Sequence, residues 1–185
     1  MSARLQSVGM IEFNSIAAGI EAADAMLKAA GVSVLLMKTI CPGKFLAGVH
    51  ADVASVRASL DAGLARGADA VVDHFLIASI SPDVIAALSC SVEKVRGGAV
   101  GVIETFSAAS CVVAADVAVK TAEVDLMEVR LAMGLGGKAV CLLCGGVGAV
   151  QAAVDAGAAE AAASGLLVRK TVIPGIAPEL MPYIM

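Results

Sequence analysis

The feature that most constrains the fold of this 185-residue chain is an internal repeat. The segment Val8-Gly9-Met10-Ile11-Glu12 recurs 92 positions later as Val100-Gly101-Val102-Ile103-Glu104. A general similarity between alanine-rich helices does not account for a repeated Gly-x-Ile-Glu segment or for lysines at matching positions. Further pairs at this offset are Ser15 with Ser107, Ala17 with Ala109, Ala22-Ala23-Asp24 with Ala114-Ala115-Asp116, Lys28 with Lys120 and Val32 with Val124.

The offset between matched segments increases along the chain. It is 94 where Asp61-Ala62-Gly63 matches Asp155-Ala156-Gly157. It is 96 where Ile80-Ser81-Pro82 matches Ile176-Ala177-Pro178. Loops tolerate small insertions between elements that keep their structure. The repeat therefore predicts two copies of one folded unit. Equivalent loops in the two copies differ slightly in length.

We expect two domains, residues 1–92 and 93–185, each a βαββαβ unit of the α/β (α+β, ferredoxin-like) class. The first strand is expected to end at Asn14 or Ser15, both good helix N-cap types, and the apolar residues after them recur at helical spacing. Cys41-Pro42-Gly43 favours a tight turn between two strands. The expected strands are 6–13, 32–40, 44–50, 71–77, 99–105, 124–132, 138–145 and 166–173. The expected helices begin after Ser15 and Asp52 and at Pro82 in the first half, and cover 107–121 and 147–164 in the second.

Composition excludes several classes of protein. Hydrophobic residues make up 59% of the chain and charged residues 16%, which is incompatible with a disordered chain. The longest segment without a charge, 139–154, is shorter than the about 20 apolar residues of a membrane-spanning helix. A net charge of −4 gives no basic surface for nucleic acid. The N-terminal residues lack the apolar region of a signal peptide, so we expect a cytoplasmic protein with reduced thiols.

With these motifs the chain resembles the tandem-domain shell proteins of bacterial microcompartments. The similarity extends over both halves and includes the Gly-x-Ile-Glu strand, the helix with Lys28, the loop Thr39–Phe45 and the loop Gly134–Lys138. It implies a homotrimer in which six similar domains form a pseudo-hexameric tile. Such tiles join other microcompartment shell proteins in a sheet around enzymes, and the tile-edge lysine of the family falls on Lys28 and Lys120.

The resemblance also implies a central pore lined by the hairpin loops. Its residues would be Ile40, Cys41, Pro42, Gly43, Leu135 and Gly136. The loop Thr39–Phe45 is similar to that of the iron–sulfur-bearing subtype from propanediol-utilisation compartments, in which the cysteine at this position, one from each subunit, holds a cluster.

The chemistry of Cys41 agrees with that implication. A closed trimer brings one residue of each chain to its threefold axis, and thiolates are the usual ligands of a [4Fe–4S] cluster. The loop 132–137 has no cysteine, so the pore would carry three thiols and one cluster per trimer. The alternative for Cys41 is a pore lined by thiols without metal, or a buried turn residue.

The other cysteines and the histidines favour structural roles. Cys141 and Cys144 have CxxC spacing, but residues three apart on a strand point to opposite faces and cannot hold one metal ion. Cys90 and Cys111 are expected to pack at the linker and in a helix. His50 and His74 do not form a pair with any carboxylate, so a zinc site is not favoured.

Two further patterns receive structural interpretations. Glycines 134, 136 and 137 resemble a phosphate-binding loop, but a strand rather than a helix is expected to follow them. Glu12 and Glu104 are matched carboxylates on the first strands, and we expect each to bond a neighbouring loop or chain.

Three functions are compatible with this sequence. The first is a structural shell tile whose pore cluster transfers electrons across the shell, with redox enzymes of the lumen as partners, or delivers clusters. The second is the same tile with a metal-free pore for small metabolites. The third is a ferredoxin-like regulator or enzyme that binds a small effector. The sequence contains no Ser-His-Asp or Cys-His pair, so we do not expect an enzyme.

Overall fold

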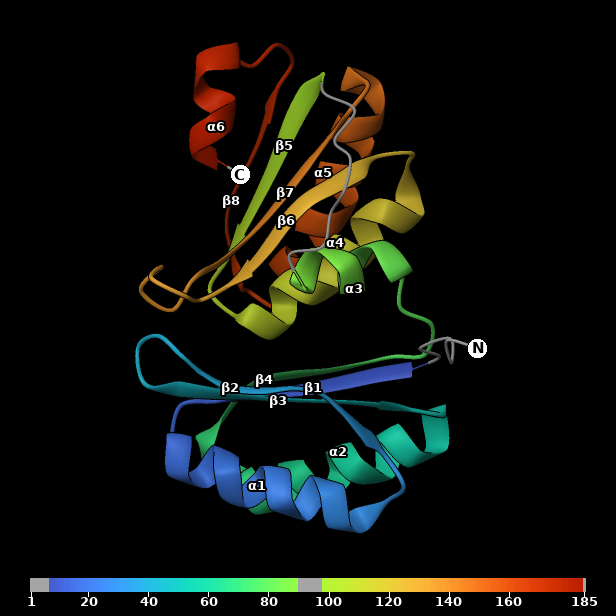
Figure 1. Ribbon diagram of the computed structural model, residues 1–185, viewed down its shortest axis with the longest axis vertical. Helices are drawn as coiled ribbons and strands as arrows, with labels where there is room; N and C mark the ends of the chain where they lie inside the picture. Colours follow the sequence, from blue (N-terminus) through green and yellow to red (C-terminus); the bar gives the residue numbers. More distant parts are fainter. Residues whose placement is uncertain (1–6, 90–97, 185) are drawn as a thin grey trace. The chain divides into compact units, whose positions relative to one another are not determined.

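The computed structural model (Figure 1) describes residues 7–89 and 98–184. The chain divides into two compact units. The first contains residues 1–80 together with 132–137, and the second contains 81–131 and 138–185. The expected domain boundary at 92/93 lies outside the described residues.

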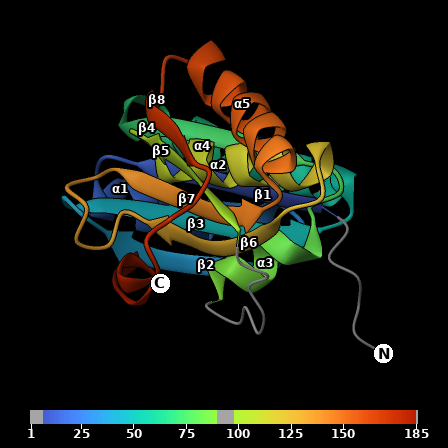
Figure 2. The ribbon, with the colours of Figure 1, turned by 90° about the horizontal axis from the view of Figure 1, so that it is seen from above.

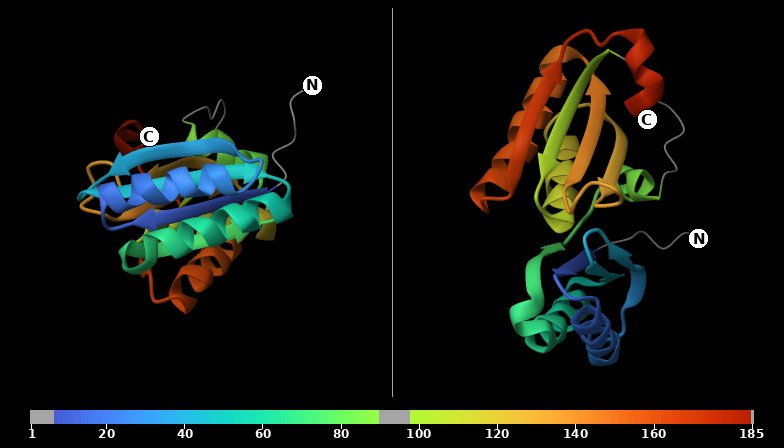
Figure 3. Two further views of the ribbon diagram at one scale, coloured as in Figure 1. Left: turned by 90° about the horizontal axis from the view of Figure 1, so that it is seen from below. Right: turned by 90° about the vertical axis from the view of Figure 1, so that its left-hand side faces the viewer.

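The first unit is a four-stranded antiparallel sheet with two helices on one face (Figure 3). The strand order is β2-β3-β1-β4, so the first strand of the repeat is central. Buried residues of the sheet and both helices, among them Ile11, Phe13, Met26 and Val56, form the core. The elements are β1 (Ser7–Phe13), α1 (Ile16–Ala29), β2 (Ser33–Ile40), β3 (Lys44–Ala51), α2 (Val53–Gly67), the 3-10 helix η1 (Ala68–Ala70) and β4 (Val71–Ile77).

The second unit repeats this arrangement with strand order β6-β7-β5-β8. Helices α4 and α5 pack together and contact the same sheet. Each half of the sequence adds a short helical segment after its last strand: α3 after β4, and η2 with α6 after β8. The elements are α3 (Pro82–Leu88), β5 (Ala99–Thr105), α4 (Ala108–Thr121), β6 (Asp125–Leu131), β7 (Ala139–Gly145), α5 (Val147–Ala163), β8 (Leu167–Ile173), the 3-10 helix η2 (Pro178–Leu180) and α6 (Met181–Ile184).

The βαββαβ prediction is confirmed in both halves. Ser15 caps α1 by accepting a hydrogen bond from the Ala18 N–H, and Ser107 caps α4 in the same way. The tight turn at residues 41–43 joins β2 and β3 as expected. No helix within the described ranges is long and apolar enough to cross a membrane.

The repeated Gly-x-Ile-Glu strand reflects close packing between sheet and helix. A Cβ atom on Gly101 would lie 2.5 Å from Cγ2 of Val154 on α5, and one on Gly9 would lie 2.6 Å from Cγ1 of Val56 on α2. Both distances are far below a normal contact. Glycine at these two positions therefore allows each helix to approach its central strand closely.

We predict that Gly101→Ala destabilises the second unit, because the added methyl group has no space and repacking costs about 1–3 kcal/mol. Gly148→Ala is the control, because Gly148 lies in α5 with open space around its Cα. Chemical denaturation should show a lower midpoint for Gly101→Ala and no such decrease for Gly148→Ala. Equal midpoints would contradict this explanation of the repeated glycine.

Candidate functional site

The turn between β2 and β3 carries Cys41 and is held by backbone hydrogen bonds. The Gly43 N–H donates to the Ile40 carbonyl oxygen at 3.1 Å, which closes the turn. Gly43 has φ +80°, a left-handed conformation that favours glycine. These features give the Cys41-Pro42-Gly43 sequence one defined local conformation.

Residues 132–137 lie against this turn within the first unit. The Cys41 N–H donates to the Ala132 carbonyl oxygen at 2.9 Å. Gly137, with φ +89°, lies so close to Pro42 that a Cβ atom would be 2.9 Å from the proline Cδ. The two loops expected to line a pore are therefore in contact, and the second supports the first.

The residues expected to line a pore have different exposures. Ile40 is buried at the end of β2, and Leu135 is half-buried. Cys41, Pro42, Gly43 and Gly136 are exposed. A depression of about 340 Å³ beside the Cys41 turn is lined by residues of both loops, including Thr39 and Met133. That these residues line a pore stays a prediction.

Cys41 differs from the other described cysteines in its exposure. Its side chain is exposed, whereas Cys111, Cys141 and Cys144 are buried. Burial raises the pKa of Cys111 to about 12. Burial, and secondarily the neighbouring Cys111, raise the pKa of Cys141 well above its usual value. These two thiols therefore stay protonated, while the position of Cys41 is open to a ligand or reagent.

The alternation expected for Cys141 and Cys144 is confirmed. Cys141 pairs with Ile103, which faces the helices, and Cys144 packs with Val100 and Leu142 in a cluster on the opposite face. His50 is half-buried on β3 and His74 is exposed on β4. Within the described ranges no three His, Cys, Asp or Glu side chains come together in a group that could hold a metal ion. Cys90 lies outside the described residues.

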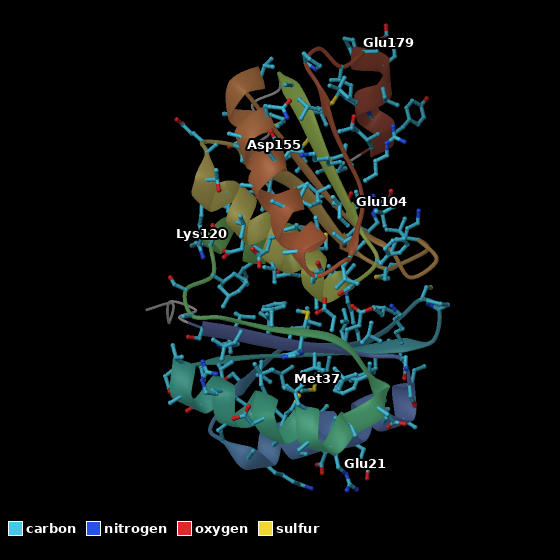
Figure 4. The ribbon with its side chains drawn as sticks, turned by 180° about the vertical axis from the view of Figure 1, so that it is seen from behind. Glu21, Met37, Glu104, Lys120, Asp155 and Glu179 are labelled. Carbon is cyan, nitrogen blue, oxygen red and sulfur yellow. The ribbon has the colours of Figure 1, made fainter. Side chains whose placement is uncertain are left out.

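Each matched glutamate bonds the lysine that comes directly after a hairpin loop. The Glu12 carboxylate is fully buried and accepts a hydrogen bond from Lys44 Nζ at 2.7 Å. Glu104, labelled in Figure 4, accepts from Lys138 Nζ at 2.6 Å. The expected bond to a neighbouring loop is therefore present in both halves. Sequence reasoning did not identify the lysine partners, because the pairing depends on cross-strand register.

The two lysines expected at the tile edge lie in the last turns of α1 and α4. Lys28 pairs with Asp24 at 2.6 Å, and Lys120 pairs with Asp116 at 2.5 Å. Both lysines are exposed, but Asp116 is buried while Asp24 is exposed. The contact of either lysine with another tile stays a prediction.

We predict that maleimide labels Cys41 in the folded, cluster-free protein faster than it labels Cys111 or Cys141. The exposed thiol is accessible, whereas the two buried thiols need an opening of the core. Peptide mass spectrometry after a timed exposure measures each site, and unfolded protein provides the control in which all sites react. Equal rates at the three sites in the folded protein would contradict the described packing.

Comparison with known proteins assigns both halves to one family. The BMC domain matches residues 7–80 and 99–176. The chain is 43% identical to bacterial microcompartment shell protein PduT of Citrobacter freundii over 169 residues, which cover 91% of this chain and 92% of that protein. It is 46% identical over 61 residues to shell protein EutM of Salmonella typhimurium, covering 33% of this chain and 64% of that one.

Solved structures agree with this assignment. A microcompartment protein from Desulfitobacterium hafniense has a TM-score of 0.84 and 47% identity, covering 95% of this chain and 98% of that chain. The fused permuted shell protein MSM0275 has a TM-score of 0.63 and 23% identity, covering 84% of this chain and 81% of that chain, a likeness in fold alone. With a matching domain in each half and a PduT relative over nearly its full length, this chain belongs to the BMC domain family.

Proposed function

We propose that this protein is a structural shell protein of a bacterial microcompartment. It forms a homotrimeric, pseudo-hexameric tile whose central pore carries Cys41 and binds one [4Fe–4S] cluster. The tandem BMC domains and the PduT relative support the shell function. The exposed thiol of Cys41, on a turn that a second loop supports, is the observation that carries the cluster assignment.

The donor set of one chain fits a cluster shared by three chains. One chain offers a single exposed thiol among its described cysteines, and a threefold axis would bring three together. The fourth iron would then take a ligand that is not a protein side chain. The bound cluster would supply one-electron redox chemistry, for electron transfer across the shell or for cluster delivery.

Backbone hydrogen bonds on both sides of Cys41 fix the turn that would present its thiol to a ligand. The Ala132 carbonyl oxygen accepts from the Cys41 N–H, and the Gly43–Ile40 hydrogen bond fixes the turn on the other side. The buried Glu12 carboxylate holds Lys44, the first residue of β3, at the end of the loop. Such supporting contacts fix the direction of a ligand side chain before the metal binds.

The partners are those that the shell function requires. Other shell proteins contact the tile at its edges, where the exposed Lys28 and Lys120 would lie, and redox enzymes of the lumen would exchange electrons with the cluster. The net charge of −4 does not favour nucleic acid.

A metal-free pore for small metabolites is the second candidate function. The loop 132–137 contains no charged side chain, and its exposed residues include Gly134 and Gly136. A lining of this kind would let small uncharged molecules pass. The metal content of protein purified without oxygen distinguishes the two pores.

We predict that Cys41→Ser abolishes cluster binding. The parent protein, purified without oxygen, should contain about four iron atoms and about four sulfides per trimer, because a cubane cluster has that composition. Cys41→Ser should contain none, since serine replaces all three protein ligands, and should still form trimers. Cys144→Ala, which removes a buried thiol outside the loop, should keep the iron. Unchanged iron content in Cys41→Ser would defeat the assignment.

We predict that Lys28→Ala combined with Lys120→Ala abolishes extended sheets and leaves trimers intact. Lys28 and Asp24 form an exposed i,i+4 ion pair, which contributes only about 0.3–0.5 kcal/mol to stability. Asp116, the buried partner of Lys120, still accepts a hydrogen bond from the Ser81 N–H when Lys120 is removed, so we expect the chain to stay folded, which circular dichroism verifies.

Electron microscopy of concentrated protein shows the sheets. The matched control is Arg66→Ala, which removes an exposed cation paired with Glu21. Normal sheets from the double variant would argue against the edge role, and discrete parent trimers that never form sheets would favour an effector-binding regulator.

A further inference from the structure

Four cationic side chains flank the two hairpin loops in the sequence. They are Lys38 and Lys44 around the first loop, and Arg130 and Lys138 around the second. Each of the two lysines that follow a loop bonds a glutamate of its own sheet, at 2.7 Å in the first half and 2.6 Å in the second. The two halves differ in the cation that precedes the loop.

In the second half, the cation before the loop is neutralised. Arg130 on β6 donates two hydrogen bonds to the Glu128 carboxylate, from Nε at 2.8 Å and from Nη2 at 2.7 Å. Such a bidentate contact is the strong form of an arginine–carboxylate pair. Residues two apart on a strand share a face, so both partners come from the same strand. This end of β6 therefore brings no net charge to the loop that extends beyond it (Figure 2).

In the first half, the equivalent cation has no carboxylate partner. Lys38 matches Arg130 at the repeat offset of 92, and Leu36 stands at the position of Glu128. Among the lysines in the described ranges, Lys38 is the one that forms no ion pair. A leucine in place of the acid therefore leaves a full positive charge at this end of β2.

The unpaired ammonium group of Lys38 lies beside the site of Cys41. Its Nζ is 4.0 Å from the Met133 sulfur, and Met133 lines the same depression of about 340 Å³ as Cys41. The segments 39–45 and 132–137 contain no acidic residue. Lys38 therefore adds a positive charge that no acid in either loop offsets.

We propose that Lys38 raises the reduction potential of the cluster that Cys41 holds. The inference rests on the proposed function, because a trimer brings three copies of Lys38 to its pore together with three copies of Cys41. One-electron reduction by a donor protein adds one negative charge there, and nearby positive charges stabilise the reduced form. Net charge around a cluster is one of the factors that set its potential. Lys38 thus tunes electron transfer without binding iron.

The two halves predict different consequences for similar substitutions. Removal of Lys38 takes three unpaired positive charges from each trimer. Removal of Arg130 together with Glu128 takes away three ion pairs and no net charge. A role in packing, by contrast, would depend on the size of the side chain and not on its charge. Comparison of the two halves therefore separates charge from structure.

The test is a redox titration of protein purified without oxygen, with dithionite as the reductant and electron paramagnetic resonance as the readout. We expect Lys38→Gln to hold the electron about tenfold less tightly, a decrease of about 59 mV for one electron. Lys38→Arg keeps the charge and should keep the parent's potential. The matched control, Glu128→Gln with Arg130→Gln, should also keep it. An unchanged potential in Lys38→Gln that retains its iron would overturn the inference, whereas a parent without iron would contradict the proposed function.

A second pair of variants neutralises Lys38 without removing it. Leu36→Glu places a carboxylate two residues before Lys38, as Glu128 stands two residues before Arg130. The potential should then fall toward that of Lys38→Gln, although the lysine is kept. Leu36→Gln, of similar size and without charge, should keep the parent's potential. Circular dichroism verifies the fold of both variants, and equal potentials in the two would overturn the inference.

Discussion

Close packing of helices on a central strand is the constraint on which the rest of the structure depends. Gly9 and Gly101 leave space for α2 and α5, so Ile11 and Ile103 can be buried beneath the helices. The residues that alternate with them, Glu12 and Glu104, point to the other face and bond lysines at the ends of the hairpin loops. Packing at the centre of each sheet is thus linked to the position of the loops at its end.

Duplication allowed the two halves to take different roles. Cys41 is present in the first hairpin loop, while the matching segment 132–137 has no cysteine and instead accepts the Cys41 N–H. One loop therefore supplies a thiol and the other supports it. The segments after β4 and β8 also differ, since α3 packs against β6 and α4, whereas the segment after β8 packs Ile176, Met181 and Ile184 on its own sheet and leaves Leu180 and Tyr183 exposed.

Much of the fold could be predicted because its signals are local. The repeat predicted the element order, and the start of the first helix was expected at Asn14 or Ser15, of which Ser15 is the cap. The alternation of a strand placed Cys141 and Cys144 on opposite faces. The turn at Cys41 was predicted from its proline and glycine. These features depend on residues that are close in sequence.

Features that depend on tertiary contacts were not predicted. The bond between the Cys41 N–H and the Ala132 carbonyl oxygen joins residues about half the chain apart. Docking of α3 on β6 and the four-residue helix α6 likewise depend on surfaces that no short pattern encodes. The exposure of Cys41, which decides its chemistry, also required the structure.

The central claim is that three Cys41 thiols meet on the axis of a trimer, and electron paramagnetic resonance tests it most directly. A spin label is attached to Cys41 in cluster-free protein with Cys90 replaced by serine. The account predicts strong dipolar broadening that disappears when labelled chains are co-assembled with an excess of unlabelled Cys41→Ser chains. Sharp spectra that do not change with this dilution would show that the three thiols lie far apart and would contradict it.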